Sequence, residues 1–370
     1  MKKLSIIILT ILSFLLLSCK NDHKSINLGS IQVLTGQMSK YGKTLQAALE
    51  AELEIINHDR TQYKQPQIKI FFQDDKLDPK TGVAAMQQLI QAYDPPVVFG
   101  ALGSSVTLAI APIANKNKVV LISPASGAPN ISDAGDYVFR TCPSDIYEAK
   151  IIAKYYSDSL NGNSLAVLYI NNDYGNGLKD SFLSSISNNK DILTFGFKQG
   201  QADFKNEITK IKSSNIQVIY LVGYEEMVTV FKQAKEMNLI CKWLGNNQMN
   251  DQTIIDKFGN TAEGTIFPGH QYDLESIKNK YSDFYKIYLQ KSGGVDLDVF
   301  AAYGVDALMV VNQVMLNNAN TGEEIKEALY KLKGFKGITG EFSFDSNGDP
   351  VRELNLYVIK EGKIVKLAGK

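Results

Sequence analysis

Few residues in this chain have the types and spacing that enzyme chemistry requires. The three histidines, His23, His58 and His270, lie far apart, and none belongs to an HExxH or zinc-finger pattern. The adjacent acids Asp74 and Asp75 follow a strand-like run, where neighbouring side chains point to opposite faces. We interpret them as a strand end rather than an acid–base pair. No catalytic residue and no metal site are therefore expected.

The glycine-rich segments give no cofactor signature either. Segment 100–105 (GALGSS) lacks the lysine of a phosphate-binding loop. Segment 174–177 (YGNG) does not match GxGxxG, and no acidic residue follows a strand at the distance that a dinucleotide site needs. The chain also contains no GxSxG elbow of a hydrolase. Both segments are more typical of strand-to-helix turns, so no cofactor is expected.

Composition indicates packed domains and excludes several classes of protein. The 370 residues are 44% hydrophobic and 21% charged, which is enough apolar material for real cores and excludes intrinsic disorder. The length suggests two domains. The 39 basic and 39 acidic residues balance, and the basic ones form no stripe, so a nucleic-acid partner is not expected. Three cysteines cannot form a disulfide framework, and we expect Cys142 and Cys241 to be unpaired thiols.

The N-terminus resembles that of a bacterial lipoprotein. Two lysines precede an apolar run over residues 4–17, which is short for a transmembrane helix and typical of a signal peptide. The run ends at Ser18-Cys19, as in a lipobox, so we expect residues 1–18 to be removed, Cys19 to be acylated and residues 19–24 to be a tether. A plain signal peptide or an uncleaved anchor is the alternative. No later segment is expected to span a membrane.

Beyond residue 25, short apolar strands alternate with amphipathic helices, which predicts βαβ units and parallel sheets covered on both faces. The first half contains expected strands at 26–34, 68–73, 97–100 and 119–123, and helices at 41–57, 80–92 and 104–115. The second half contains helices at 145–159, 178–187, 204–213 and 226–237, and strands at 165–169, 192–197, 218–222, 243–245 and 265–267. Helices at 274–292 and 299–317 follow, and then strands at 340–344 and 354–359. The predicted fold class is α/β, with two doubly wound halves.

Four segments together resemble a known family. They are 29–36 (GSIQVLTG), 74–79 (DDKLDP), 99–105 (FGALGSS) followed by 122–126 (ISPAS), and 338–345 (ITGEFSFD) followed by 347–350 (NGDP). In this order, and behind a lipobox, they resemble the type I periplasmic solute-binding proteins of ABC transporters, in particular the branched-chain amino-acid-binding (Leu/Ile/Val-binding) family. The resemblance covers essentially the whole mature chain.

This resemblance implies two Rossmann-like lobes joined by a hinge of three chain crossings, with the ligand trapped between them. Carried over to this sequence, lobe one comprises residues 25–143 and 269–344, and lobe two comprises residues 144–268 and 345–370. Binding is expected to close the lobes on the hinge.

The resemblance also implies the ligand-binding residues. Ser104 begins a predicted helix and matches the family's carboxylate-binding serine, since helix N-termini present free N–H groups. The expected set is Tyr41, Ser104, Ala125, Ser126 and Phe300 from lobe one, and Tyr174, Tyr224 and Asn247 from lobe two. A simple helix cap at Ser104, and ordinary packing of each aromatic side chain, are the alternatives.

Two positions depart from the family pattern. Gly127 stands where a hydroxyl is usual, and Asn247 stands where an acid usually pairs with the ligand's ammonium group. Glu225 and Asp298 could replace that acid, although each is better interpreted as a rim or cap residue. The departures favour an amide or small carboxylate over an α-amino acid, while a branched-chain amino acid remains the largest single named possibility.

The expected function is therefore solute capture without chemistry. A monomeric, lipid-anchored protein of the cell envelope, on the extracytoplasmic side, would deliver a small polar solute to the permease subunits of an ABC importer. The alternative is a ligand-sensing module that presents solute to a membrane receptor. An enzyme on the same fold is disfavoured because nucleophile and metal patterns are missing.

Overall fold

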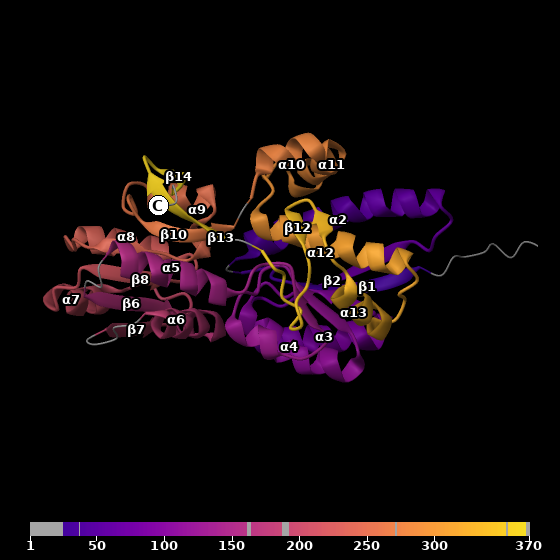
Figure 1. The fold of residues 1–370 in the computed structure, drawn as a ribbon, viewed down its shortest axis with the longest axis horizontal. Helices are drawn as coiled ribbons and strands as arrows, with labels where there is room; N and C mark the ends of the chain where they lie inside the picture. Colours follow the sequence, from indigo (N-terminus) through magenta and orange to yellow (C-terminus); the bar gives the residue numbers. More distant parts are fainter. Residues whose placement is uncertain are drawn as a thin grey trace, which may run out of the picture.

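The computed structural model of the chain describes residues 25–367, apart from positions 37, 161–163, 187–191, 271 and 353. The predicted signal peptide, Cys19 and the tether lie outside these residues. The chain forms two α/β lobes that lie side by side, with the C-terminal strands in the lobe on the left of Figure 1.

The first lobe is built on a five-stranded sheet in the order β2-β1-β3-β4-β5, in which every neighbouring pair is parallel. Its strands are β1 (Ile26–Gln32), β2 (Ile68–Asp74), β3 (Val97–Phe99), β4 (Val120–Ser123) and β5 (Val138–Arg140). The helices of this lobe are α2 (Ser39–Gln62), α3 (Pro79–Tyr93), α4 (Ser104–Asn117), α10 (Leu274–Lys280), α11 (Ser282–Ser292), α12 (Val299–Leu316) and α13 (Gly322–Lys331). The small hairpin of β11 (Phe335–Gly337) and β12 (Gly340–Phe342) packs beside α12.

Side-chain alternation along the strands explains why both faces of this sheet are covered. Val97 and Phe99 on β3 point into a core that includes residues of α2, α12 and α13. Val98, between them, points into a second core formed with α3 and α4. All residues of β3 and β4 are buried, as expected for strands of a parallel sheet with helices on both sides.

The second lobe contains a seven-stranded sheet in the order β14-β13-β10-β9-β8-β6-β7. Its strands are β6 (Leu165–Ile170), β7 (Leu193–Phe197), β8 (Val218–Val222), β9 (Lys242–Leu244), β10 (Ile266–His270), β13 (Leu354–Lys360) and β14 (Lys363–Lys366). The helices are α5 (Asp145–Ser159), α6 (Asp173–Ser185), α7 (Lys205–Ser213), α8 (Glu226–Glu236) and α9 (Gln252–Phe258). β13 is antiparallel to both β10 and β14, so the sheet is mixed rather than wholly parallel as predicted.

The chain passes between the lobes at three places: between β5 and α5, between β10 and α10, and between Pro350 and β13. The turn at 345–349 was expected in lobe two, but it lies on lobe one. Asp349 forms a buried ion pair with Arg140 of β5, and Phe344 forms a β-bridge with Pro350. A buried guanidinium needs an anionic partner, and this requirement fixes the turn against the first lobe.

The helices differ from the sequence prediction at several points, and α9 and α13 were not predicted. The segment 274–292 is two helices, because the first ends at Tyr281 before α11 begins. α6 begins at Asp173, five residues earlier than predicted, because the side chain of Asn172 accepts a hydrogen bond from the backbone of Gly175. Among the described residues, α12 is long and apolar enough to cross a membrane, which the sequence analysis overlooked; 78% of it is buried inside the protein.

Candidate ligand-binding site

A small cavity of about 20 Å³ lies between the two lobes. It is lined from lobe one by Met38, Leu77, Leu102, Gly103, Ser104, Ala125 and Phe300, and from lobe two by Tyr174, Tyr224 and Gln248. Five of the eight predicted ligand-binding residues are therefore brought together here. This volume holds about one water molecule.

Two helix N-termini approach this cavity from opposite lobes. Ser104, the first residue of α4, is buried, and its hydroxyl accepts a hydrogen bond from the backbone N–H of Ala128 at 3.3 Å. Across the cleft, the backbone N–H of Asp173 at the start of α6 donates to the hydroxyl of Ser105 at 3.4 Å. Since the first turn of a helix has free N–H groups and partial positive charge, this edge of the cleft suits an anion.

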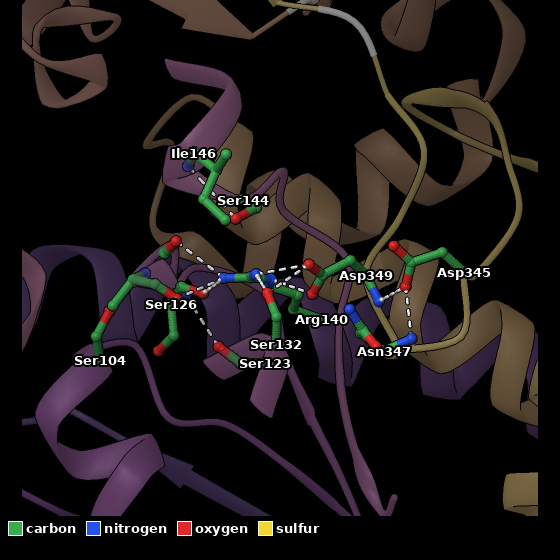
Figure 2. Close-up of polar contacts among 12 residues, drawn as sticks. Ser104, Ser123, Ser126, Ser132, Arg140, Ser144, Ile146, Asp345, Asn347 and Asp349 are labelled. Carbon is green, nitrogen blue, oxygen red and sulfur yellow. Dashed lines mark hydrogen bonds and ion pairs between the residues drawn. The ribbon is translucent and has the colours of Figure 1, made fainter. Parts of the chain in front are cut away.

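The loop after β4 is held by hydroxyl and guanidinium contacts (Figure 2). The hydroxyl of Ser126 lies 2.8 Å from the hydroxyl of Thr107 and donates to the carbonyl of Ala101 at 2.9 Å. Arg140 donates to the carbonyl of Gly127 at 2.9 Å, and Figure 2 shows its guanidinium between this loop and Asp349. Ser126 is fully buried and does not line the cavity. The structure therefore gives Ser126 a loop-holding position, whereas the sequence predicted a ligand contact.

Aromatic side chains form two pairs at the cleft. The rings of Tyr174 and Tyr224 are stacked, with centroids 5.4 Å apart, and the rings of Tyr41 and Phe300 meet edge to face at 5.9 Å. The Tyr174 hydroxyl donates to the side-chain oxygen of Asn247 at 3.3 Å. Tyr41 and Asn247 do not line the small cavity; they line an adjacent cavity of about 410 Å³, which shares Phe300 and Gln248 with it.

A polar cluster joins the lobes beside this larger cavity. Lys40 of α2 forms an ion pair of 3.1 Å with Asp251, the N-cap residue of α9, and also contacts the hydroxyl of Thr253. The hydroxyl of Tyr41 donates to the same carboxylate at 2.8 Å. Burial tends to raise the pKa of Asp251, but Lys40 and these hydroxyl donors together lower it below its usual value. We call Lys40, Tyr41 and Asp251 the interlobe latch.

Gly127 and Asn247, the two positions that depart from the family pattern, are each contacted by an acid of α5 that was not predicted from the sequence. A Cβ atom at Gly127 would lie 2.1 Å from the Oδ1 atom of Asp145, so this carboxylate fills the space that a larger side chain would need. The backbone N–H of Asn247 donates to Glu148 at 3.1 Å. Two acids in the first turn of a helix are ordinary partners of the helix dipole, and nothing in the sequence marks this pair as special.

Glu225 and Asp298, the two acids that the sequence offered in place of the one missing at position 247, already have other partners. Glu225 forms an ion pair with Lys257 at 2.8 Å, and both side chains are partly exposed. Asp298 is the N-cap of α12, accepting from the backbone N–H of Ala301, and it also contacts the hydroxyl of Thr44. Both therefore have the rim and cap positions that the sequence favoured for them.

Comparison with known proteins identifies the family to which this two-lobed chain belongs. A model of the periplasmic binding protein family matches residues 25–363. The chain belongs to this family. The Leu/Ile/Val-binding protein homolog 3 of Brucella melitensis is 24% identical and covers 93% of this chain and 94% of its own length. A leucine-, isoleucine-, valine-, threonine- and alanine-binding protein of Pseudomonas aeruginosa is 26% identical and covers 85% of this chain and 84% of its own.

Solved structures of the family agree with the fold. The branched-chain amino acid transporter substrate-binding protein of Streptococcus pneumoniae, in complex with isoleucine, superposes with a TM-score of 0.79 at 25% identity, covering 93% of this chain and all of that one. An ABC-transporter solute-binding protein of Rhodopseudomonas palustris, in complex with 3,4-dihydroxybenzoic acid, has a TM-score of 0.77 at 21% identity, covering 93% and 96%. The predicted family and two-lobed α/β fold are thus confirmed. These relatives are solute-binding proteins and not enzymes, in agreement with the sequence prediction.

Proposed function

We propose that this protein is the lipid-anchored, extracytoplasmic solute receptor of an ABC importer, and that it captures a small solute bearing a carboxylate by closing its lobes. The observation that carries the proposal is the cavity between the lobes that brings together five of the predicted ligand-binding residues, with the N-terminus of α4 at its edge. Family membership supports the extracytoplasmic location and the partnership with permease subunits.

Lobe closure follows from the same geometry. Ser104 comes from one lobe, while Tyr174 and Tyr224 come from the other, so a solute that touches all three binds the closed state more tightly than the open state. A cavity too small for a solute larger than water further requires that the lobes part before entry. Solute binding and hinge closure are therefore one event in this proposal.

A binding screen with a matched pair of variants tests the proposal. Purified protein is screened by thermal shift against amino acids, amides and small carboxylates, since ligand at 100 times its Kd adds about 2.7 kcal/mol of stability. Ser104→Ala should weaken the bound carboxylate by roughly 10- to 150-fold, the effect of removing a charge-assisted hydrogen bond. The control is Ser184→Ala, on the exposed part of α6.

Small-angle scattering completes the test. The radius of gyration should fall when the identified solute is added and stay constant when a non-binding compound is added. Wild-type affinity in Ser104→Ala would contradict the proposed site, and an unchanged radius would contradict hinge closure.

A further inference from the structure

The described chain begins at the side of lobe one that faces away from the cleft. The carboxyl ends of β3 and β4 lead directly to Ser104 and Ala125, which line the cavity between the lobes. Because all strands of this sheet are parallel, their amino ends lie together on the opposite side of the lobe. β1 begins there, where the backbone N–H of Ile26 donates to the carbonyl of Gln67 at 2.8 Å. We call this side the distal face of lobe one, made of the loops 63–67, 94–96 and 116–119 and the segment 316–321.

Two large apolar side chains are exposed on the distal face, beside the start of β1. Tyr63 is 71% exposed and Leu316 is 46% exposed. They follow two helices that run side by side in the same direction, α2 and α12. Arg60 near the end of α2 donates to the side-chain oxygen of Asn312 on α12 at 2.6 Å, and Tyr63 and Leu316 each lie about one helical turn beyond this contact. The two side chains are therefore neighbours at one edge of the face.

The length of the proposed tether limits how far the distal face can stand from a membrane. Residues 19–24 join the proposed acylated cysteine to Ser25, the first described residue. Six residues span at most about 20 Å even when they are fully extended. The distal face is therefore held close to the bilayer, whereas lobe two lies on the other side of the cleft (Figure 1).

The chemistry of the distal face fits the surface of a phospholipid bilayer. A tyrosine has an apolar ring and a polar hydroxyl, which suits the boundary between headgroups and acyl chains. The charges on the face are mixed: Lys64, Lys116 and Asp94 are exposed, and Lys118 is paired with Glu323 at 2.9 Å. The contact is therefore apolar in the main and should not require anionic lipid. Two such side chains bind a membrane weakly by themselves, but a short tether gives them a high effective concentration at its surface.

We propose that the distal face of lobe one rests on the bilayer that holds the lipid anchor, with Tyr63 and Leu316 inserted at its surface. This inference rests on the proposed lipid anchor and goes beyond it by naming the face that meets the membrane. Lobe one is then the fixed lobe, and lobe two stands on the outer side of the cleft. Closure on a solute moves lobe two relative to the membrane.

Quenching by brominated lipids tests which end of the molecule meets the membrane. Full-length lipidated protein is purified from membranes and reconstituted into vesicles of phosphatidylcholine, with or without phosphatidylglycerol, and with or without bromine on the acyl chains. The single native tryptophan is removed by Trp243→Phe, and a reporter is introduced by Tyr63→Trp. Its emission should fall in brominated vesicles of both compositions.

Ile240→Trp is the matched control for position. Ile240 is 93% exposed and lies, like Tyr63, between the end of a helix and the start of a strand, but in lobe two, between α8 and β9. Its emission should not change in the same vesicles. A second reporter, Gln67→Trp on the distal face, tests the contact itself. Its quenching should weaken when Tyr63→Ser and Leu316→Ser are added, although the protein stays in the membrane fraction through Cys19.

Three outcomes would overturn the inference and leave the solute receptor intact, since solute binding is measured separately by thermal shift. Equal emission changes at Tyr63→Trp and Ile240→Trp, or none at either, would mean that the distal face does not rest on the bilayer. Unchanged quenching of Gln67→Trp after the two serine substitutions would mean that these side chains do not make the contact.

The third outcome concerns a different occupant of the face. If the Cys19→Ser protein is a dimer that Tyr63→Ser and Leu316→Ser convert to a monomer, the face binds a second copy of the chain instead. An unmodified Cys19 in the intact mass of the membrane-purified protein would remove the proposed anchor, and this inference would fail with it.

Discussion

Removal of the carboxylate of Asp349 should cause a large loss of stability, because it would leave Arg140 buried without its ion-pair partner. Arg140 is completely inaccessible, and two of its nitrogens donate to the two oxygens of Asp349 at 2.6 and 2.8 Å. Breaking a buried pair by removing one partner costs about 3–5 kcal/mol. In Asp349→Ala we therefore expect this loss in the free energy of unfolding, with a melting temperature lower by roughly 6–10 °C, at about 2 °C per kcal/mol for a large chain.

The measurement is urea or thermal unfolding of Asp349→Ala against a surface control. Asp158→Ala removes the partner of Lys154 on α5, where both side chains are exposed, and should change stability by less than about 1 kcal/mol. The double variant Arg140→Met/Asp349→Leu removes the unpaired charge but also the donor to the carbonyls of Gly127 and Ala128, so it should recover only part of the loss. Solute affinity should also fall in Asp349→Ala, because Arg140 holds the carbonyls of Gly127 and Ala128 beside the cleft. A loss below about 1 kcal/mol in Asp349→Ala would refute this account of the turn.

Three further predictions concern the latch, the buried acids and the N-terminus. Asp251→Asn weakens the interlobe latch, so scattering should show a larger radius of gyration in the absence of solute. Solute affinity should fall roughly tenfold, as for a lost charge-assisted hydrogen bond. An unchanged radius would contradict the latch. Because the pKa of Asp145 is raised to about 7 in the fold, its contribution to stability is present below its unfolded pKa near 4 and is lost as pH rises through about 7. Melting curves should therefore show Asp145→Asn gaining stability relative to wild type at alkaline pH but not below pH 4, and a pH-independent difference would disprove the shift. Cys19→Ser should move the protein from the membrane fraction to the soluble fraction, whereas continued membrane association would exclude acylation as the anchor.

The sequence by itself determined the α/β class of this protein, because that class depends on local apolar pattern. The α/β alternation follows from apolar periodicity, and the start of α5 at Asp145 is marked by Ser144, which caps that helix. Family motifs at strand ends located Ser104, Ala125, Tyr174, Tyr224 and Phe300, all of which line one cavity. These residues share a cavity because the strand and helix ends that carry them face the same cleft.

Only the tertiary structure decided how the remaining polar groups are used. Ser126 holds the loop after β4 because the hydroxyl of Thr107, remote in sequence, lies within hydrogen-bonding distance. Asp145 reaches Gly127 only because the first passage between the lobes brings α5 against the loop after β4. Burial and hydrogen-bond partners arise from contacts between distant segments, and a pattern of local residues does not contain them. For that reason the sequence showed that position 247 lacks an acid, but it did not show that Asp145 lies against Gly127.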